Sequence, residues 1–85
     1  MNILAIESSS KECNVAIKYE KKIYELSAQM NNDSATNLPI ITEELINKLS
    51  LDFSDLDAIA ISMGPGSFTS LRVALSYAKG LAMAL

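Results

Sequence analysis

Two polar stretches of the chain carry residue types from which a phosphate site or a catalytic site could be built. The first is Glu7-Ser8-Ser9-Ser10, where serine hydroxyls and backbone N–H groups could hold a phosphate, and the glutamate a metal ion or a water molecule. The competing interpretation is a hydrophilic turn whose serines bond their own backbone. The spacing alone favours the turn.

The second stretch runs from Met63 to Arg72 and joins an apolar run to an apolar-periodic run. Gly64-Pro65-Gly66 fixes a tight turn that few other residues could form. The lysine of a P-loop and the pattern of a nucleophile elbow are both missing. We therefore expect a structural turn, with Ser67 or Thr69 as the N-cap of the next helix. Arg72 either meets a partner such as a carboxylate or is an ordinary surface arginine.

Composition narrows the possible functions. The chain has 85 residues, a formal net charge of −3, one cysteine and no histidine. An acidic chain is a poor stand-alone binder of nucleic acid, and a triad or zinc site that needs histidine cannot be built from it. The lone Cys13 and the absence of a membrane-length apolar run or a signal sequence favour the cytoplasm.

Hydrophobic periodicity predicts an α/β domain with the order βββαβα. Three antiparallel strands feed a helix, which crosses over to a fourth strand parallel to the first, so the sheet is mixed. The first helix begins either just before Pro39, where the proline is well placed, or at Ser34, in which case Pro39 costs it one backbone hydrogen bond and bends it. The expected strands are 2–6, 13–18, 23–29 and 58–63; the first helix ends at about Leu49, and the last helix is expected over 71–85.

The strands offer apolar side chains to both faces of this sheet, while the helices can cover only one main face. The small residues Ala58 and Ala60 could make the second face tolerable, or a missing domain or partner could cover it. The two groups expected on opposite faces are Ile3, Ala5, Ile59 and Ile61, against Leu4, Ile6, Val15 and Ile17.

Each expected helix carries an apolar stripe. The stripe of the last helix has spacings of 4, 3, 4 and 3, which is typical of a coiled-coil seam. One side should meet the sheet and the other the first helix or another subunit; the alternative is a simple core helix. The stripes consist of Leu38, Ile41 and Leu45, with Ile46 and Leu49, and of Leu71, Leu75, Ala78, Ala82 and Leu85.

Several strings, in this order, resemble the N-terminal domain of the TsaB (YeaZ) family. They are Asn-Ile-Leu-Ala-Ile-Glu-Ser-Ser from Asn2, Cys-Asn-Val-Ala-Ile from Cys13, Leu-Pro-Ile-Ile-Thr-Glu-Glu-Leu from Leu38 and Ala-Ile-Ser-Met-Gly-Pro-Gly-Ser-Phe-Thr-Ser-Leu-Arg-Val-Ala from Ala60. The resemblance covers essentially the whole chain. This sequence differs from the usual family pattern at Glu7-Ser8. It also differs at Ser70 and Ala74, two positions where the family commonly has glycine.

The resemblance implies half of an actin-like, ribonuclease H-like ATPase fold, with residues 1–85 as the N-terminal domain and the family's second domain absent. It implies a role in making N6-threonylcarbamoyladenosine in tRNA as a non-catalytic partner of TsaD. TsaE and a second copy are further partners, and tRNA is reached only through the complex. No catalytic or metal residue and no firmly bound cofactor are expected, with weak ATP or ADP contact at an interface left open.

In that family the pairing uses the helices of each N-terminal domain. Carried onto this sequence, the expected partner interface is Leu38, Ile41, Leu45, Leu71, Arg72, Leu75, Ala78 and Ala82. The rival interpretation is the phosphate- or nucleotide-binding half of an ATPase or sugar-kinase-like enzyme that uses Glu7-Ser8-Ser9-Ser10. We do not expect this chain alone to hydrolyse ATP.

Overall fold

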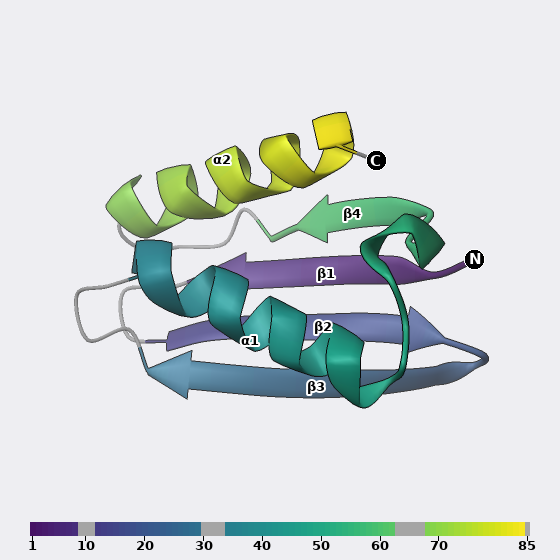
Figure 1. The fold of residues 1–85 in the computed structure, drawn as a ribbon. Helices are drawn as coiled ribbons and strands as arrows, with labels where there is room; N and C mark the ends of the chain where they lie inside the picture. The colour runs from purple at the N-terminus through teal and green to yellow at the C-terminus, as the bar shows by residue number, and fades with distance from the viewer. Residues whose placement is uncertain (9–11, 30–33, 63–67, 85) are drawn as a thin grey trace.

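The computed structural model describes residues 1–8, 12–29, 34–62 and 68–84 (Figure 1). The predicted order βββαβα is confirmed, with one short 3-10 turn added before the last strand. The elements are β1 Ile3–Ser8, β2 Glu12–Tyr19, β3 Lys22–Gln29, α1 Ser34–Lys48, η1 Phe53–Asp55, β4 Ala58–Ile61 and α2 Phe68–Ala84.

The strands form one mixed sheet in the order β3-β2-β1-β4. β2 pairs antiparallel with β1 and β3, and β4 lies parallel to β1, as predicted. The β2–β3 connection turns through Glu20 and Lys21, which have φ values of 50° and 70°. Positive φ at both central residues gives such a turn the right-handed twist of the flanking strands.

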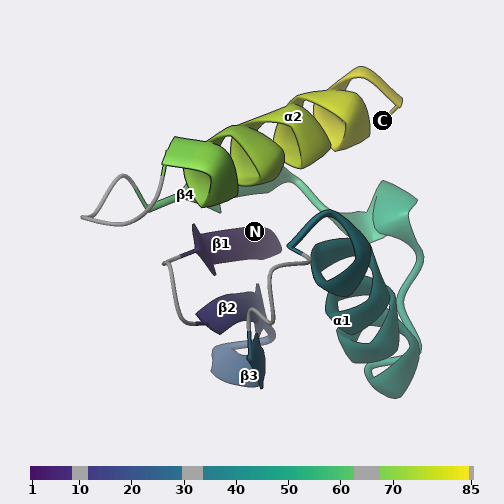
Figure 2. The same ribbon diagram turned by 90° about the vertical axis from the view of Figure 1, so that its left-hand side faces the viewer.

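Both helices pack on the same face of the sheet, and no helix or strand of the described residues lies on the other face (Figure 2). α1 packs on β2 and β3, whereas α2 packs on β4 and β1 and also touches α1. We call these two sides the covered face and the open face. The predicted one-sided sheet is thus confirmed for the part of the chain that the structure describes.

The strand register corrects the prediction of which β4 residues share a face. Ile59 pairs with Leu4 and Ile61 with Ile6, so both isoleucines belong to the covered face and not beside Ile3 and Ala5. Ala58 and Ala60 take the open face. The phase of a strand that follows a crossover depends on where pairing starts, and the sequence of β4 does not encode this start.

The C-terminal end of α1 explains how the chain leaves that helix. The Leu51 N–H donates to the Ile46 carbonyl and the Ser50 N–H to the Asn47 carbonyl, at 3.1 Å each. This pattern is a Schellman motif, with Ser50 in the left-handed conformation at φ 56°. At the other end α1 begins at Ser34, so Pro39 lies inside the helix and leaves one backbone carbonyl without its usual partner.

A network at the start of β1 ties the N-terminus to the segment before β4. The Asn2 N–H donates to Asp57 Oδ2 at 2.7 Å, and the Asp57 N–H donates to the Asn2 carbonyl at 2.8 Å. Within the turn η1, the Asp52 N–H donates to Asp55 Oδ2 at 2.8 Å. These bonds fix the register of β4 against β1, on which the position of α2 depends.

Candidate partner surface

Four of the eight residues expected at a partner interface face the chain's own core. Leu38, Ile41 and Leu45 of α1 are buried among the side chains of the covered face, and so is Ala78 of α2. Leu75 is half-buried, and Ala82 and Arg72 are exposed. Leu71 lies in the first turn of α2, and Leu85 lies outside the described residues. The apolar stripes therefore supply mainly the core, and a partner would have to meet other residues of the same helices.

Each helix presents a mixed polar and apolar surface to the outside. On α1, Ile40 is 55% exposed and is flanked by the exposed Glu43 and Glu44. On α2, Met83 is 88% exposed and follows the exposed Lys79 on the same helix. Sequence reasoning did not place Ile40 at a contact surface, because it lies off the stripe. An apolar residue off the stripe is itself the signal that would have found it.

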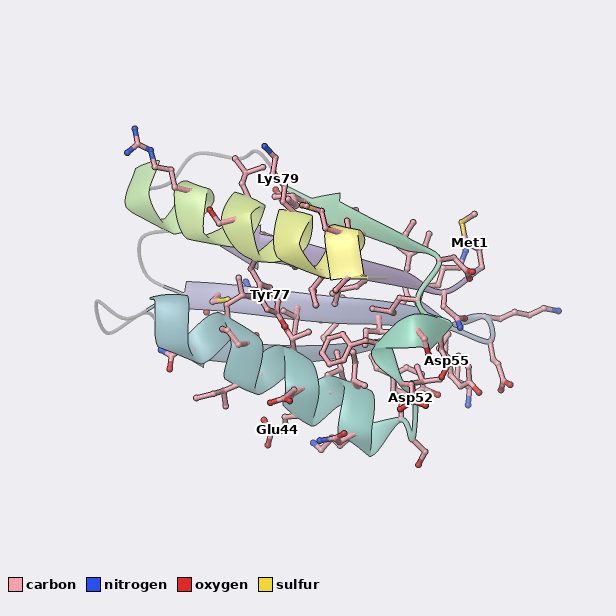
Figure 3. All side chains as sticks on the ribbon, turned by 45° about the horizontal axis from the view of Figure 1, so that its top comes forward. Met1, Glu44, Asp52, Asp55, Tyr77 and Lys79 are labelled. Atoms are coloured by element: carbon pink, nitrogen blue, oxygen red, sulfur yellow. The ribbon has the colours of Figure 1, made fainter. Side chains whose placement is uncertain are left out.

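The outward faces of the helices carry opposite charge. On α1 the exposed Glu43 and Glu44 outweigh the exposed Lys48 in the last turn, and on α2 the exposed charges Arg72 and Lys79 are basic. We call Ile40, Glu43, Glu44, Arg72, Lys79 and Met83 together the outward helix surface; it has two parts, because Glu44 and Lys79 point away from each other (Figure 3). Each part favours a partner segment of opposite charge and disfavours one of like charge.

Tyr77 of α2 is half-buried and packs against the core on the side of α2 that faces α1 (Figure 3 labels Tyr77). Burial raises the pKa of Tyr77, the neighbouring Thr42 hydroxyl of α1 opposes that rise, and the Glu43 carboxylate adds to it. Tyr77 is therefore neutral at physiological pH.

The open face holds a shallow hollow of about 520 Å³. Its floor is a row of alanines, because Ala5 pairs with Ala16 on one side and with Ala60 on the other. Glu7 and Glu25 are among the polar residues at its edge. The alanine side chains leave space between the larger side chains around them. This hollow is therefore a second candidate contact region.

The structure places the predicted phosphate residues only in part. Glu7 is exposed near the end of β1, and Ser8 is the last residue of that strand. Ser9 and Ser10 lie outside the described residues, as does the expected turn Gly64-Pro65-Gly66 with Ser67. Of the two N-cap candidates, Thr69 lies within α2, which begins at Phe68, and the other, Ser67, lies outside the described residues.

Three further observations concern metal binding, the cysteine and membrane spans. The side chains that the structure describes contain no group of three or more acidic, cysteine or histidine residues that could hold a metal ion. Burial raises the pKa of the Cys13 thiol to about 11, so this cysteine is a poor nucleophile at neutral pH. No helix within the described ranges is long and apolar enough to cross a membrane.

The mixed sheet, the parallel β1–β4 pair and the helices after β3 and β4 define the class: an actin-like ATPase half-fold. A family profile described as "TsaD: tRNA N6-adenosine threonylcarbamoyltransferase" matches residues 28–85. A solved structure entitled "YeaZ from Pseudomonas aeruginosa" superposes with a TM-score of 0.91 at 31% identity, covering 98% of this chain and 39% of that one.

Curated relatives point to one branch of this group. TsaB of Buchnera aphidicola from Acyrthosiphon pisum is 36% identical over 83 residues, covering 98% of this chain and 38% of the relative. TsaB of Haemophilus influenzae is 36% identical, covering 96% of this chain and 35% of the relative. The transferase of Kosmotoga olearia is also 36% identical, but its match extends over 101 residues. The chain belongs to the TsaB (YeaZ) family, as the resemblance predicted.

The chain spans about two fifths of the length of the TsaB relatives that it matches (38% and 40% for two Buchnera proteins). The matched part contains the sheet and the helices described above. The outward helix surface thus belongs to the portion that this chain shares with its relatives.

Proposed function

We propose that the chain takes part in the biosynthesis of threonylcarbamoyladenosine in tRNA, as a non-catalytic subunit that pairs with the transferase TsaD in the cytoplasm. The proposal rests on the match of nearly the whole of this chain to proteins named for this biosynthesis. The non-catalytic role rests on the sequence, which has no histidine and one cysteine. That cysteine is buried in the core and protonated at neutral pH.

The outward helix surface is the part of the chain that would meet TsaD. Exposed Ile40 and Met83 supply apolar area, and the surrounding charges supply orientation. The buried stripe residues pack the two helices onto the sheet and would not contact a partner. Charged substitutions at Ala78 would therefore disrupt the core first, and exposed residues make better probes of pairing.

Co-elution with TsaD from the same cell tests the proposal. The double variant Glu43→Lys/Glu44→Lys reverses the charge of the α1 face, and we expect it to weaken binding by about tenfold or more. The matched control is Glu25→Lys, an equally exposed glutamate on the open face. Binding should survive that change. If the wild-type chain and TsaD elute separately, or if Glu25→Lys is the damaging variant, the proposal is wrong.

A second candidate function is a nucleotide-binding half-site. The hollow on the open face favours it, because Glu7, Asn14 and Ser62 line that hollow near the ends of β1 and β4. Ligand pockets often combine an apolar floor with a few convergent polar groups. Titration calorimetry with ATP and magnesium separates the two candidates. Tight binding by this chain alone supports the half-site, and the absence of heat change supports the partner role.

A further inference from the structure

Gly80, in the interior of α2, is a glycine that the chain's own packing does not require. It is exposed, and beyond its own turns of the helix a Cβ at this position would meet no described atom within 4 Å. No glycine of the described residues has a positive φ, so the backbone does not require it either. Glycine destabilises a helix interior relative to alanine. At an exposed position it allows another surface to approach the helix backbone closely.

Gly80 borders a stripe of exposed residues on the outward side of α2. Arg72, Ser76, Lys79 and Met83 recur at spacings of 4, 3 and 4, and all four are exposed. Residues with this spacing lie on one side of a helix. Arg72 and Lys79 are seven residues apart, which is about 10 Å along the helix axis, and α2 contains no acidic residue. This side of α2 therefore presents two positive charges beside a glycine.

The open face presents two carboxylates with a similar separation. Glu7 pairs with Asn14 across β1 and β2, and Ala16, two residues further along β2, pairs with Glu25 across β2 and β3. The two glutamates are therefore two strands and two residues apart, so their Cα atoms are about 12 Å apart. Both are exposed, and both line the hollow. The long side chains of the two α2 cations can reach both carboxylates at once.

The middle of the open face carries smaller side chains than contact with water alone would require. Ala5, Ala16 and Ala60 lie side by side across three strands. Alanine is depleted in strands, and an antiparallel sheet that faces water normally has polar side chains on that face. A row of alanines lets a helix approach the sheet closely, as the buried Ala74 and Ala78 do for α2 on the covered face.

We propose that the open face docks α2 of a second copy of this chain. Glu7 and Glu25 each meet one of the two cations of that copy's α2, and its Gly80 lies close to the alanine row. The contact joins two unlike surfaces, so copies associate head to tail, unlike a symmetric pairing of helices. A single helix on one sheet face buries little area, so the association is weak and depends on concentration.

The charges of the open face favour this occupant over a negatively charged one. Glu12 adds a third carboxylate, and within the described part of this face Lys18 is the single cation. Lys18 lies opposite Ile3 and Ile23, in the row on the far side of the alanines from Glu7. Self-association goes beyond the proposed function and does not depend on it. Because α2 is also part of the outward helix surface, TsaD and a second copy would compete for it.

Sedimentation velocity over a concentration series tests the contact by exchanging its charges. Glu7→Lys/Glu25→Lys makes the open face basic, and Arg72→Glu/Lys79→Glu makes the outward side of α2 acidic. Each variant alone should need at least about tenfold more protein than the parent to associate, because like charges then face each other. An equal mixture of the two variants should associate as the parent does, since each basic surface meets an acidic one.

Exposed positions on α1 provide matched controls, which are Glu44→Lys for the open-face variant and Lys48→Glu for the α2 variant. Both should associate as the parent does. Gly80→Leu keeps every charge and favours the helix, yet it should also weaken association, because the added side chain holds the two surfaces apart. Circular dichroism checks that each variant is folded.

A parent that stays monomeric over the whole series overturns the inference, as does a mixture that fails to associate. Undiminished association of Glu7→Lys/Glu25→Lys also overturns it, because a pairing of helices does not use the open face. Adding TsaD separates this inference from the proposed function. Self-association without TsaD binding refutes the pairing with TsaD and leaves the docking surface in place, whereas TsaD binding by a chain that does not self-associate does the reverse.

Discussion

The two faces of the sheet are built from alternating residues of the same strands, but they carry different kinds of side chain. On the covered face, Leu4, Ile6, Val15 and Ile17 are buried beneath α1 and α2. On the open face the positions between them are mainly alanines and polar residues, with Ile3 half-buried and the edge residue Ile23 66% exposed. Most of the large apolar side chains of the sheet therefore lie on the face that the helices cover.

This difference separates residues that hold the domain together from residues that are free to meet other molecules. Each large side chain on the covered face contributes to stability by leaving water. An alanine row on the open face loses little by staying in water, because a methyl group has little apolar area. The same division applies to the helices, whose inward alanines and leucines are core and whose outward charges are available.

Truncating an isoleucine on each face gives the largest expected difference in stability between the two faces. Ile17→Ala removes a fully buried side chain and should lower the free energy of unfolding by about 2 to 5 kcal/mol. Ile23→Ala removes an exposed one from the next strand and should cost less than about 1 kcal/mol. Urea denaturation followed by circular dichroism measures both.

Ile17→Val guards against a variant that does not fold, since it should cost about 0.5 to 1.5 kcal/mol and leave a measurable transition. Equal losses for Ile17→Ala and Ile23→Ala would mean that both faces are buried in solution, and the distinction between them would fail.

A second pair extends the comparison to α2. Ala74→Leu inserts a large side chain where the alanine is fully buried and should destabilise by about 1 to 3 kcal/mol. Ala82→Leu makes the same change at an exposed position and should be nearly neutral in thermal melts. If Ala82→Leu is the more damaging, the inward and outward sides of α2 have been assigned the wrong way round.

The smallest expected effect concerns the end of α1, the helix that covers β2 and β3. Ser50 adopts a left-handed conformation that glycine takes without strain, so Ser50→Gly should raise the free energy of unfolding by about 1 kcal/mol. Ser54→Gly, at an exposed position in η1, is the control and should not stabilise. A loss of stability in Ser50→Gly would argue against the Schellman end of α1.

The sequence was sufficient for the element order, the antiparallel start of the sheet, the parallel β4 and the one-sided covering. These follow from local patterns, such as the short hairpins and the period of apolar residues in the helices. The phase of β4 against β1 could not be predicted, because it depends on bonds between distant residues: the Asn2 N–H donates to the Asp57 carboxylate, and the Asp57 N–H donates to the Asn2 carbonyl.

The interface prediction rests on a pattern that fits two interpretations. An apolar stripe on a helix has the same spacing whether it packs on its own sheet or on another subunit. Leu38, Ile41 and Leu45 fit both interpretations, and the structure assigns them to the core.

Backbone hydrogen exchange of the chain, measured with and without TsaD, shows which face the partner meets. We expect slower exchange in α1 and α2 when TsaD is present, with little change in β3 at the edge of the open face. Protection of β2 and β3, with α1 and α2 unchanged, would show that the partner meets the open face and would refute pairing through the helices.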